Sequence, residues 1–149
     1  MPLILTEEQQ MIRDAAKEFI QEKAPVRMLR ELRDSSDANG YSPELWQEMA
    51  ELGWAGMAIE EKYGGLDFGY VGLGIVLESC GRNLVPSPLI STTLLGRSII
   101  QLSGSEPQKD EMLPRLAAGD MLLSLAIDER NHHSTRGFET SVTVSAGKQ

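Results

Sequence analysis

The spacing of apolar residues changes once along this chain of 149 residues, and that change constrains the possible fold more than any other feature. Over roughly the first 120 residues, apolar side chains recur every four positions, as at Met11, Ala15 and Phe19, which is typical of one face of an α-helix. Residues 140–146 instead alternate between apolar and polar side chains, which indicates a β-strand. The sequence therefore predicts a mainly α fold, a helical bundle of five to six helices followed by a short β-hairpin.

Capping and helix-breaking residues divide the first part of the chain into separate helices. The pairs Thr6 with Gln9 and Ser105 with Gln108 form capping-box patterns, which predict helix N-termini at these positions. Pro25 disfavours helical backbone at the residue before it, so the first helix is expected to end near residue 24. We expect helices over about residues 6–24, 26–34, 42–53, 71–80, 89–102 and 105–118.

The two patterns also predict two domains of unequal completeness. Residues 1–120 are expected to form a whole helical domain. Residues 121–149 contain only two expected strands, and two strands alone do not form a stable sheet. We therefore interpret residues 121–149 as the incomplete start of a second, β-rich domain.

Composition and charge exclude several classes of protein. The chain has 22 acidic and 14 basic residues and a net charge of -8, which disfavours binding to the phosphate backbone of nucleic acids. A single cysteine, Cys80, excludes an intramolecular disulfide and suits a reducing compartment. No segment approaches the roughly 20 apolar residues of a membrane-spanning helix. We expect a cytoplasmic protein that binds neither nucleic acid nor membrane.

Known catalytic and metal-binding patterns are not completed in this sequence. Gly72-Leu73-Gly74 begins like a dinucleotide-binding fingerprint, but Leu77 stands in place of the third glycine and no expected strand precedes it. His132 and His133 are adjacent, so their side chains tend to point apart, and no third metal ligand accompanies them. From these residues we assign no metal site and no catalytic group.

Several short motifs follow one another in an order and spacing that resemble the N-terminal part of the acyl-CoA dehydrogenase family. They are Leu5-Thr6-Glu7-Glu8-Gln9, Leu52-Gly53-Trp54, Glu60-Glu61-Lys62-Tyr63-Gly64-Gly65, Glu78-Ser79-Cys80-Gly81-Arg82 and Leu113-Pro114-Arg115-Leu116-Ala117-Ala118-Gly119. The resemblance implies a helical N-terminal domain, followed in the family by a β-barrel-like middle domain and a C-terminal four-helix domain. It also implies flavin adenine dinucleotide (FAD) as cofactor, bound between the domains.

The resemblance implies α,β-dehydrogenation of an acyl-CoA thioester as the reaction. Such chemistry needs a carboxylate base in a desolvated pocket, where burial raises its pKa. In the family this base lies in the C-terminal domain, which the expected elements of this chain do not reach. The resemblance therefore assigns no catalytic residue here, and we expect the isolated chain to be inactive.

The resemblance also suggests residues for two binding sites. Aligned through Glu129, the flavin-contacting positions of the family fall at Leu125, Ile127, Asp128 and Ser134, with Asp128 where the family has threonine. An acyl pocket is expected to be lined by Ser91, Leu94 and Leu95, although a place in the helix core is the alternative for these three. The passage Pro86-Ser87-Pro88-Leu89 resembles family branches that act on branched or bulky acyl groups.

Two hypotheses of different classes follow. In the first, the chain is the N-terminal portion of an oligomeric dehydrogenase, completed by further domains or by another dehydrogenase chain, with acyl-CoA as substrate. In the alternative, it is a non-catalytic helical interaction module, or a partner subunit, derived from a dehydrogenase. The length and branching of the acyl chain do not follow from the sequence.

Overall fold

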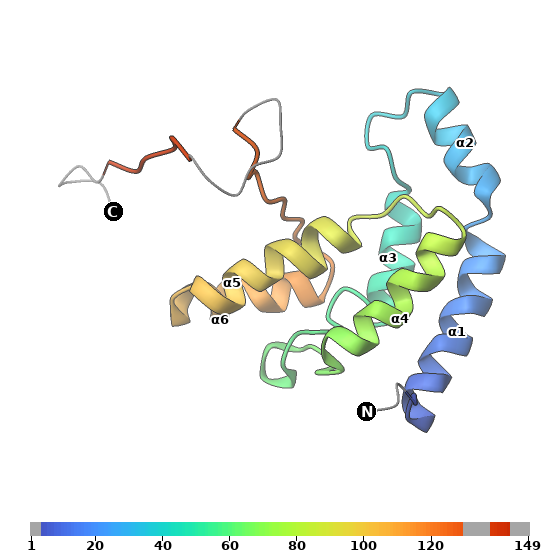
Figure 1. The fold of residues 1–149 in the computed structure, drawn as a ribbon, viewed down its shortest axis with the longest axis horizontal. Helices are drawn as coiled ribbons and strands as arrows, with labels where there is room; N and C mark the ends of the chain where they lie inside the picture. Colours follow the sequence, from blue (N-terminus) through green and yellow to red (C-terminus); the bar gives the residue numbers. More distant parts are fainter. Residues whose placement is uncertain (1–3, 130–137, 144–149) are drawn as a thin grey trace.

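A computed structural model describes residues 4–129 and 138–143, and Figure 1 shows its helices. These residues form six α-helices, one 3-10 helix (η1) and one π-helix (η2), which confirms the predicted mainly α fold. The elements are α1 (Glu7–Lys23), α2 (Val26–Asp34), α3 (Pro43–Glu51), η1 (Glu61–Tyr63), α4 (Gly69–Arg82), η2 (Leu89–Gly96), α5 (Arg97–Ser103) and α6 (Glu106–Ala117). None of the helices in this part of the chain has the length and apolar character needed to cross a bilayer.

The N-terminus of α1 has the predicted capping box. The Thr6 hydroxyl accepts the backbone N–H of Gln9 at 3.2 Å, and the Gln9 side chain accepts the backbone N–H of Thr6 at 3.0 Å. The prediction of one helix over residues 89–102 is wrong in detail, because the segment is a π-helix as far as Gly96 and an α-helix after it. A mostly apolar segment of this length does not distinguish these two helix types.

The predicted β-hairpin is not confirmed. Residues 121–129 and 138–143 contain no strand, and the residues from 144 onward lie outside the described part of the chain. One contact does join the two expected arms, because the Glu129 carboxylate accepts the backbone N–H groups of Glu139, at 2.5 Å, and Thr140, at 3.1 Å. The hairpin therefore stays a prediction.

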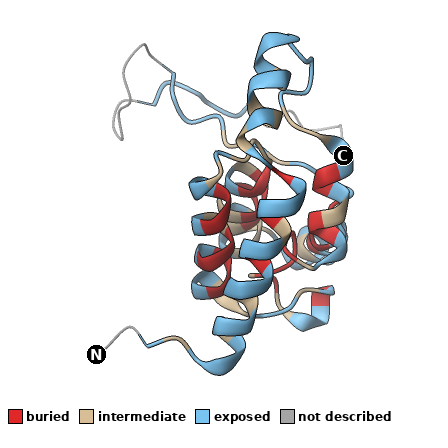
Figure 2. Ribbon diagram, turned by 90° about the vertical axis from the view of Figure 1, so that its right-hand side faces the viewer, coloured by how far each residue is buried: buried red, intermediate tan, exposed pale blue. Residues whose placement is uncertain are grey.

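The helices enclose two apolar clusters, and Figure 2 shows the buried residues gathered on the inward faces of the helices. The larger cluster joins α1, α3, α4 and the turn after α3, with Trp46, Met49, Met57 and Val76 among its members. The smaller cluster joins η1 to α6. Helix α2 has no buried residue and lies at the edge of the bundle (Figure 1).

A long-range contact fixes the chain where it leaves α6. The Trp46 indole N–H donates to the Gly119 carbonyl at 3.0 Å, and Trp46 is buried. Gly119 has a φ of +78°, and a Cβ at this position would lie 2.5 Å from the Ala50 Cβ, so both conformation and space require glycine. This junction directs residues 121–124 back toward η2.

Candidate functional site

A pocket of about 480 Å³ lies where four segments meet near the start of η2, and we call it the η2 pocket. Its walls come from the loop between α2 and α3, the segment after α4, the first half of η2 and the segment after α6. The lining residues are Asn39, Gly40, Tyr41, Pro86, Ser87, Pro88, Ser91, Thr92, Leu122, Leu123 and Ser124. In sequence these segments are far apart, so only the tertiary fold brings them together.

The start of η2 shapes one wall of this pocket. The Pro88 carbonyl accepts both the backbone N–H of Thr92, at 2.8 Å, and the Ser91 hydroxyl, at 3.1 Å. Pro88 is the N-cap residue of η2, and the carbonyl of an N-cap residue accepts the first hydrogen bond of the helix. π-helical turns occur frequently at functional sites, because they displace side chains from regular helical positions.

Thr92 attaches the segment after α6 to η2. Its hydroxyl accepts the backbone N–H of Leu123 and donates to the Leu123 carbonyl, both at 3.0 Å. Thr92 is 1% exposed, and a Cβ on Gly96, one turn later, would overlap the Leu123 Cβ. Close approach and paired hydrogen bonds therefore hold Leu123 against η2 and form the second wall.

The η2 pocket contains free polar groups but no formal charge. No Asp, Glu, Lys, Arg or His lines it within the described part of the chain. Among the described residues, the side chains of Asn39, Tyr41, Ser87 and Ser124 find no hydrogen-bond partner. An amide and three hydroxyl groups are therefore available to a bound molecule.

The residues predicted for the acyl site occupy three different environments. Ser91 lines the η2 pocket. Leu94 is half-buried and packs against the larger apolar cluster, as the helix-core alternative expected, and Leu95 is 40% exposed. The structure thus brings Ser91 to the pocket, while Leu94 and Leu95 are absent from its lining.

The residues predicted for the flavin site follow directly after the η2 pocket. Leu125 is half-buried, whereas Ile127 and Asp128 are exposed, and Ser134 lies outside the described residues. The backbone groups of Leu125 and Ile127 make no hydrogen bond to the described part of the chain. Next to them, the backbone N–H of Glu139 and the Thr140 side chain hydrogen-bond to Glu129 and hold the pKa of its carboxyl below the ordinary value.

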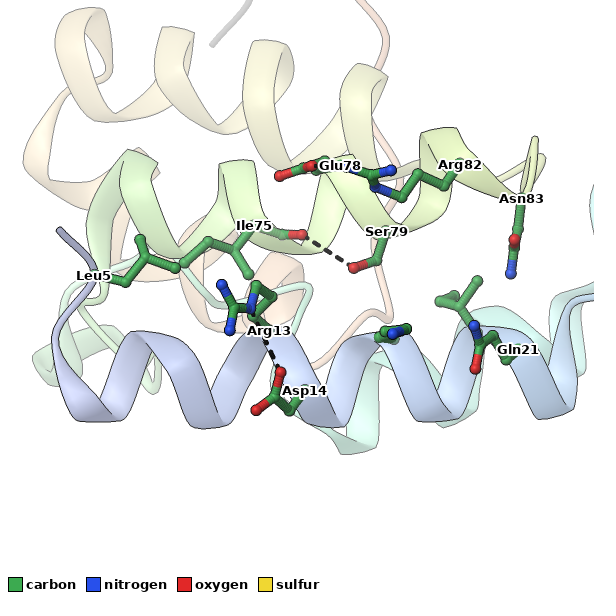
Figure 3. A pocket seen from close by; sticks show the side chains of 11 residues that line it. Leu5, Arg13, Asp14, Gln21, Ile75, Glu78, Ser79, Arg82 and Asn83 are labelled. Carbon is green, nitrogen blue, oxygen red and sulfur yellow. Dashed lines mark hydrogen bonds and ion pairs between the residues drawn. The ribbon is translucent and has the colours of Figure 1, made fainter. Parts of the chain in front are cut away.

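A second pocket of about 480 Å³ lies between α1 and α4, and we call it the α1–α4 pocket (Figure 3). Five charged side chains line it, and four of them form ion pairs: Arg13 with Asp14 at 3.4 Å, and Arg82 with Glu78 at 2.6 Å; Lys17 is the fifth. Leu5 lies at one end and Asn83 at the other. None of the predicted site residues lines this pocket, so the η2 pocket is the candidate functional site.

No carboxylate in the described part of the chain is buried. Glu60 is half-buried, and its contacts with Lys62 and with the Gln101 amide hold the pKa of its carboxyl below the ordinary value. A general base for C–H abstraction needs the opposite shift. Within residues 4–129 and 138–143 there is also no group of three side chains suited to holding a metal ion.

Comparison with protein families gives a match over most of the chain. The family model described as "Acyl-CoA dehydrogenase, N-terminal domain" matches residues 6–120. The acyl-CoA dehydrogenase IpdE2 of Mycolicibacterium smegmatis is 30% identical over 107 residues, which cover 71% of this chain and 34% of that protein. The chain spans between about a third and two fifths of the length of this and two other curated relatives that it matches.

Solved structures share the same arrangement of helices. An acyl-CoA dehydrogenase from Bacillus anthracis, complexed with FAD, is similar with a TM-score of 0.69 and 28% identity over 83% of this chain and 21% of that one. A chain of the ChsE4-ChsE5 complex from Mycobacterium tuberculosis is similar with a TM-score of 0.78 over 90% of this chain and 36% of that one. Its identity of 22% shows a shared fold only.

Proposed function

This chain belongs to the acyl-CoA dehydrogenase family, and from that premise we propose that it forms the N-terminal domain of a flavin-dependent acyl-CoA dehydrogenase. Residues 1–120 are the helical domain, and residues 121–149 begin the β domain with the predicted hairpin. The single observation that carries the proposal is the η2 pocket, where Ser91 meets the segment that leads to Leu125. The pocket forms one wall of the acyl-CoA site.

The proposed reaction removes a proton from the carbon next to the thioester and a hydride from the following carbon, which leaves a trans-2-enoyl-CoA. FAD, when bound, supplies the acceptor for the hydride. The residues of this chain position the acyl group: Ser91 and the apolar wall at Leu122 and Leu123 line the space that it enters. Because the described carboxylates are exposed or hydrogen-bonded, the base comes from another domain or chain.

Leu125, Ile127, Asp128 and Ser134 are the proposed flavin contacts. The backbone groups of Leu125 and Ile127 fit this role, because they have no other hydrogen-bond partner in the described chain and belong to the segment that Thr92 fixes through Leu123. Leu94 and Leu95 remain proposed contacts on the acyl side. The oligomer of the complete enzyme, or a second dehydrogenase chain, supplies the remaining surfaces of both sites.

Cofactor content and ligand binding test this proposal. We expect the complete enzyme, which contains this chain together with the other domains or chains, to carry FAD. Addition of an acyl-CoA ester should then bleach the flavin absorbance near 450 nm in a saturable way. Replacement of Ser91 by phenylalanine fills space in the η2 pocket. We expect this variant to need a higher acyl-CoA concentration for half-maximal bleaching of the flavin. A protein that carries no flavin and shows no saturable binding of acyl-CoA would contradict the proposal and favour the alternative, a non-catalytic interaction module.

A further inference from the structure

We propose that the η2 pocket selects an acyl group that carries an uncharged oxygen substituent, a hydroxyl or a ketone, over plain alkyl chains and over chains that end in a carboxylate. This inference rests on the proposed function and names the substrate class of the same site. It follows from three properties of the pocket: free hydrogen-bonding groups, absence of charge, and a partly apolar wall.

Free hydrogen-bonding groups reach the pocket from different parts of the chain. Asn39 and Tyr41 come from the loop between α2 and α3, Ser87 from the segment before η2, and Ser124 from the segment after α6. A plain alkyl chain would displace water from these groups without replacing its hydrogen bonds, which opposes binding. A hydroxyl or ketone oxygen restores such bonds, so the lining favours an oxygenated acyl group.

The loop that carries Asn39 is held in place before any ligand binds. The Asp37 carboxylate accepts the backbone N–H groups of Asn39, at 2.9 Å, and Gly40, at 3.0 Å. Gly40 has a φ of +69°, and glycine adopts this backbone conformation without strain. The Asn39 amide is therefore presented by a fixed turn, which lowers the entropy lost when it binds an oxygen atom.

The absence of charge excludes an ionised acyl group. Among residues 4–129 and 138–143 no basic side chain lines the pocket, so a terminal carboxylate would lose water there without gaining a cationic partner. Charged side chains line the α1–α4 pocket instead, among them Lys17 and the two ion pairs Arg13–Asp14 and Arg82–Glu78.

The remaining walls and the size suit a carbon skeleton with a few polar positions. Pro86, Pro88, Leu122 and Leu123 supply apolar surface beside the polar groups. The volume of about 480 Å³ lies within the range of small-molecule pockets, which is about 300–1,000 Å³. The pocket is thus large enough to hold part of an acyl group, with its polar side chains in reach of an oxygen on that group.

Three CoA esters of equal carbon number test the inference on the natural, FAD-loaded protein: one with an unsubstituted alkyl chain, one hydroxylated beyond the reacting carbons, and one that ends in a carboxylate. Dissociation constants come from the change in flavin absorbance. We expect the hydroxylated ester to bind at least about tenfold more tightly than either of the others. Replacement of the Asn39 amide (Asn39→Ala) is expected to reduce this preference several-fold.

Asn83→Ala is the matched control, because Asn83 lines the α1–α4 pocket and is expected to leave the preference unchanged. If the unsubstituted or the carboxylate ester binds as tightly as the hydroxylated one, the inference is wrong while the proposed function stands. An equal loss of preference in Asn39→Ala and Asn83→Ala would also overturn it. If none of the three esters binds, both the proposed function and the inference fail.

Discussion

The η2 pocket and the α1–α4 pocket have the same volume, about 480 Å³, but opposite chemistry. The α1–α4 pocket lies between two regular helices, and four of its charged side chains form two exposed ion pairs, Arg13 with Asp14 and Arg82 with Glu78. The η2 pocket lies among loops and a π-helix, and four of its polar side chains have no partner among the described residues: Asn39, Tyr41, Ser87 and Ser124. The two pockets thus share a volume but differ in charge, and of the two only the uncharged one is lined by a predicted site residue, Ser91.

The two pockets also differ in what holds their walls together. Extensive packing between α1 and α4 buries apolar side chains such as Ile20, Leu73 and Val76, so these helices need no specific polar contact. The wall of the η2 pocket depends on a few contacts of Leu123, with Thr92 and with Gly96. Single substitutions should therefore damage the η2 pocket more readily than the α1–α4 pocket.

The largest effect is expected for Gly96→Val. A side chain at this position overlaps Leu123 and approaches the Ser91 carbonyl, so the free energy of unfolding should fall by about 3 kcal/mol, with loss of acyl-CoA binding. Urea denaturation measures the first effect and ligand titration the second.

Gly74→Ala is the control, because no atom lies within 4 Å of a Cβ there. Replacing a glycine within a helix is expected to stabilise the protein by about 0.5–1 kcal/mol. Unchanged stability of Gly96→Val would show that Leu123 does not pack on η2.

The second-largest effect is a difference in stability between substitutions of two neighbouring threonines, Thr92 and Thr93. Thr92→Val leaves the N–H and carbonyl of Leu123 without their partner and is expected to cost about 2 kcal/mol in the free energy of unfolding. Thr93 is equally buried, but its hydroxyl has no partner among the described residues, so Thr93→Val should be neutral or stabilising. Thermal and urea denaturation of both variants measure the difference. Equal destabilisation by the two substitutions would contradict the assigned role of Thr92.

A smaller, pH-dependent effect is expected in the region of α4. Burial raises the pKa of the Cys80 thiol from 9.0 to about 11. The folded chain thus holds this proton more tightly than the unfolded chain, so the contribution of Cys80 to stability is complete below pH 9 and decreases as the pH rises toward 11. Urea denaturation between pH 9 and 11 measures how steeply the free energy of unfolding falls with pH. In Cys80→Ala this fall should be less steep, because the thiol no longer contributes to it. An unchanged slope in Cys80→Ala would assign the pH dependence to other groups.

The smallest effect is expected for Arg82→Ala in the α1–α4 pocket. The Arg82 and Glu78 side chains are 74% and 60% exposed, and solvent-exposed ion pairs contribute little to stability. We expect no measurable change in urea denaturation or in acyl-CoA binding. A clear loss of acyl-CoA binding in this variant would indicate that the α1–α4 pocket, and not the η2 pocket, takes part in acyl-CoA binding.

Local sequence signals predicted most of the helices and the family. The capping box of Thr6 and Gln9 forms as expected, and the order of the short motifs identified the family whose model matches residues 6–120. These signals succeed because capping depends on residues three positions apart, and motif order is a property of the sequence itself. No capping residue or motif in the sequence marks the change from π-helix to α-helix after Gly96.

The η2 pocket could be predicted only in part, because its contacts are long-range. Ser91 is predicted from the family resemblance and lines the pocket, but no local pattern marks Asn39 or Tyr41, which lie about fifty positions earlier in the sequence. Thr92 bonds to a residue 31 positions away, and nothing in the local pattern indicates that partner. A polar residue in an otherwise apolar helix, followed four residues later by glycine, is the signal that could have found this contact.

A photoreactive acyl-CoA ester, cross-linked to the natural FAD-loaded protein and mapped by mass spectrometry, tests most directly whether the η2 pocket receives the acyl group. The account predicts saturable labelling within residues 87–92 and 122–124, with competition by unlabelled acyl-CoA. Competable labelling that falls instead on α1 and α4, around Lys17 and Arg82, would contradict it.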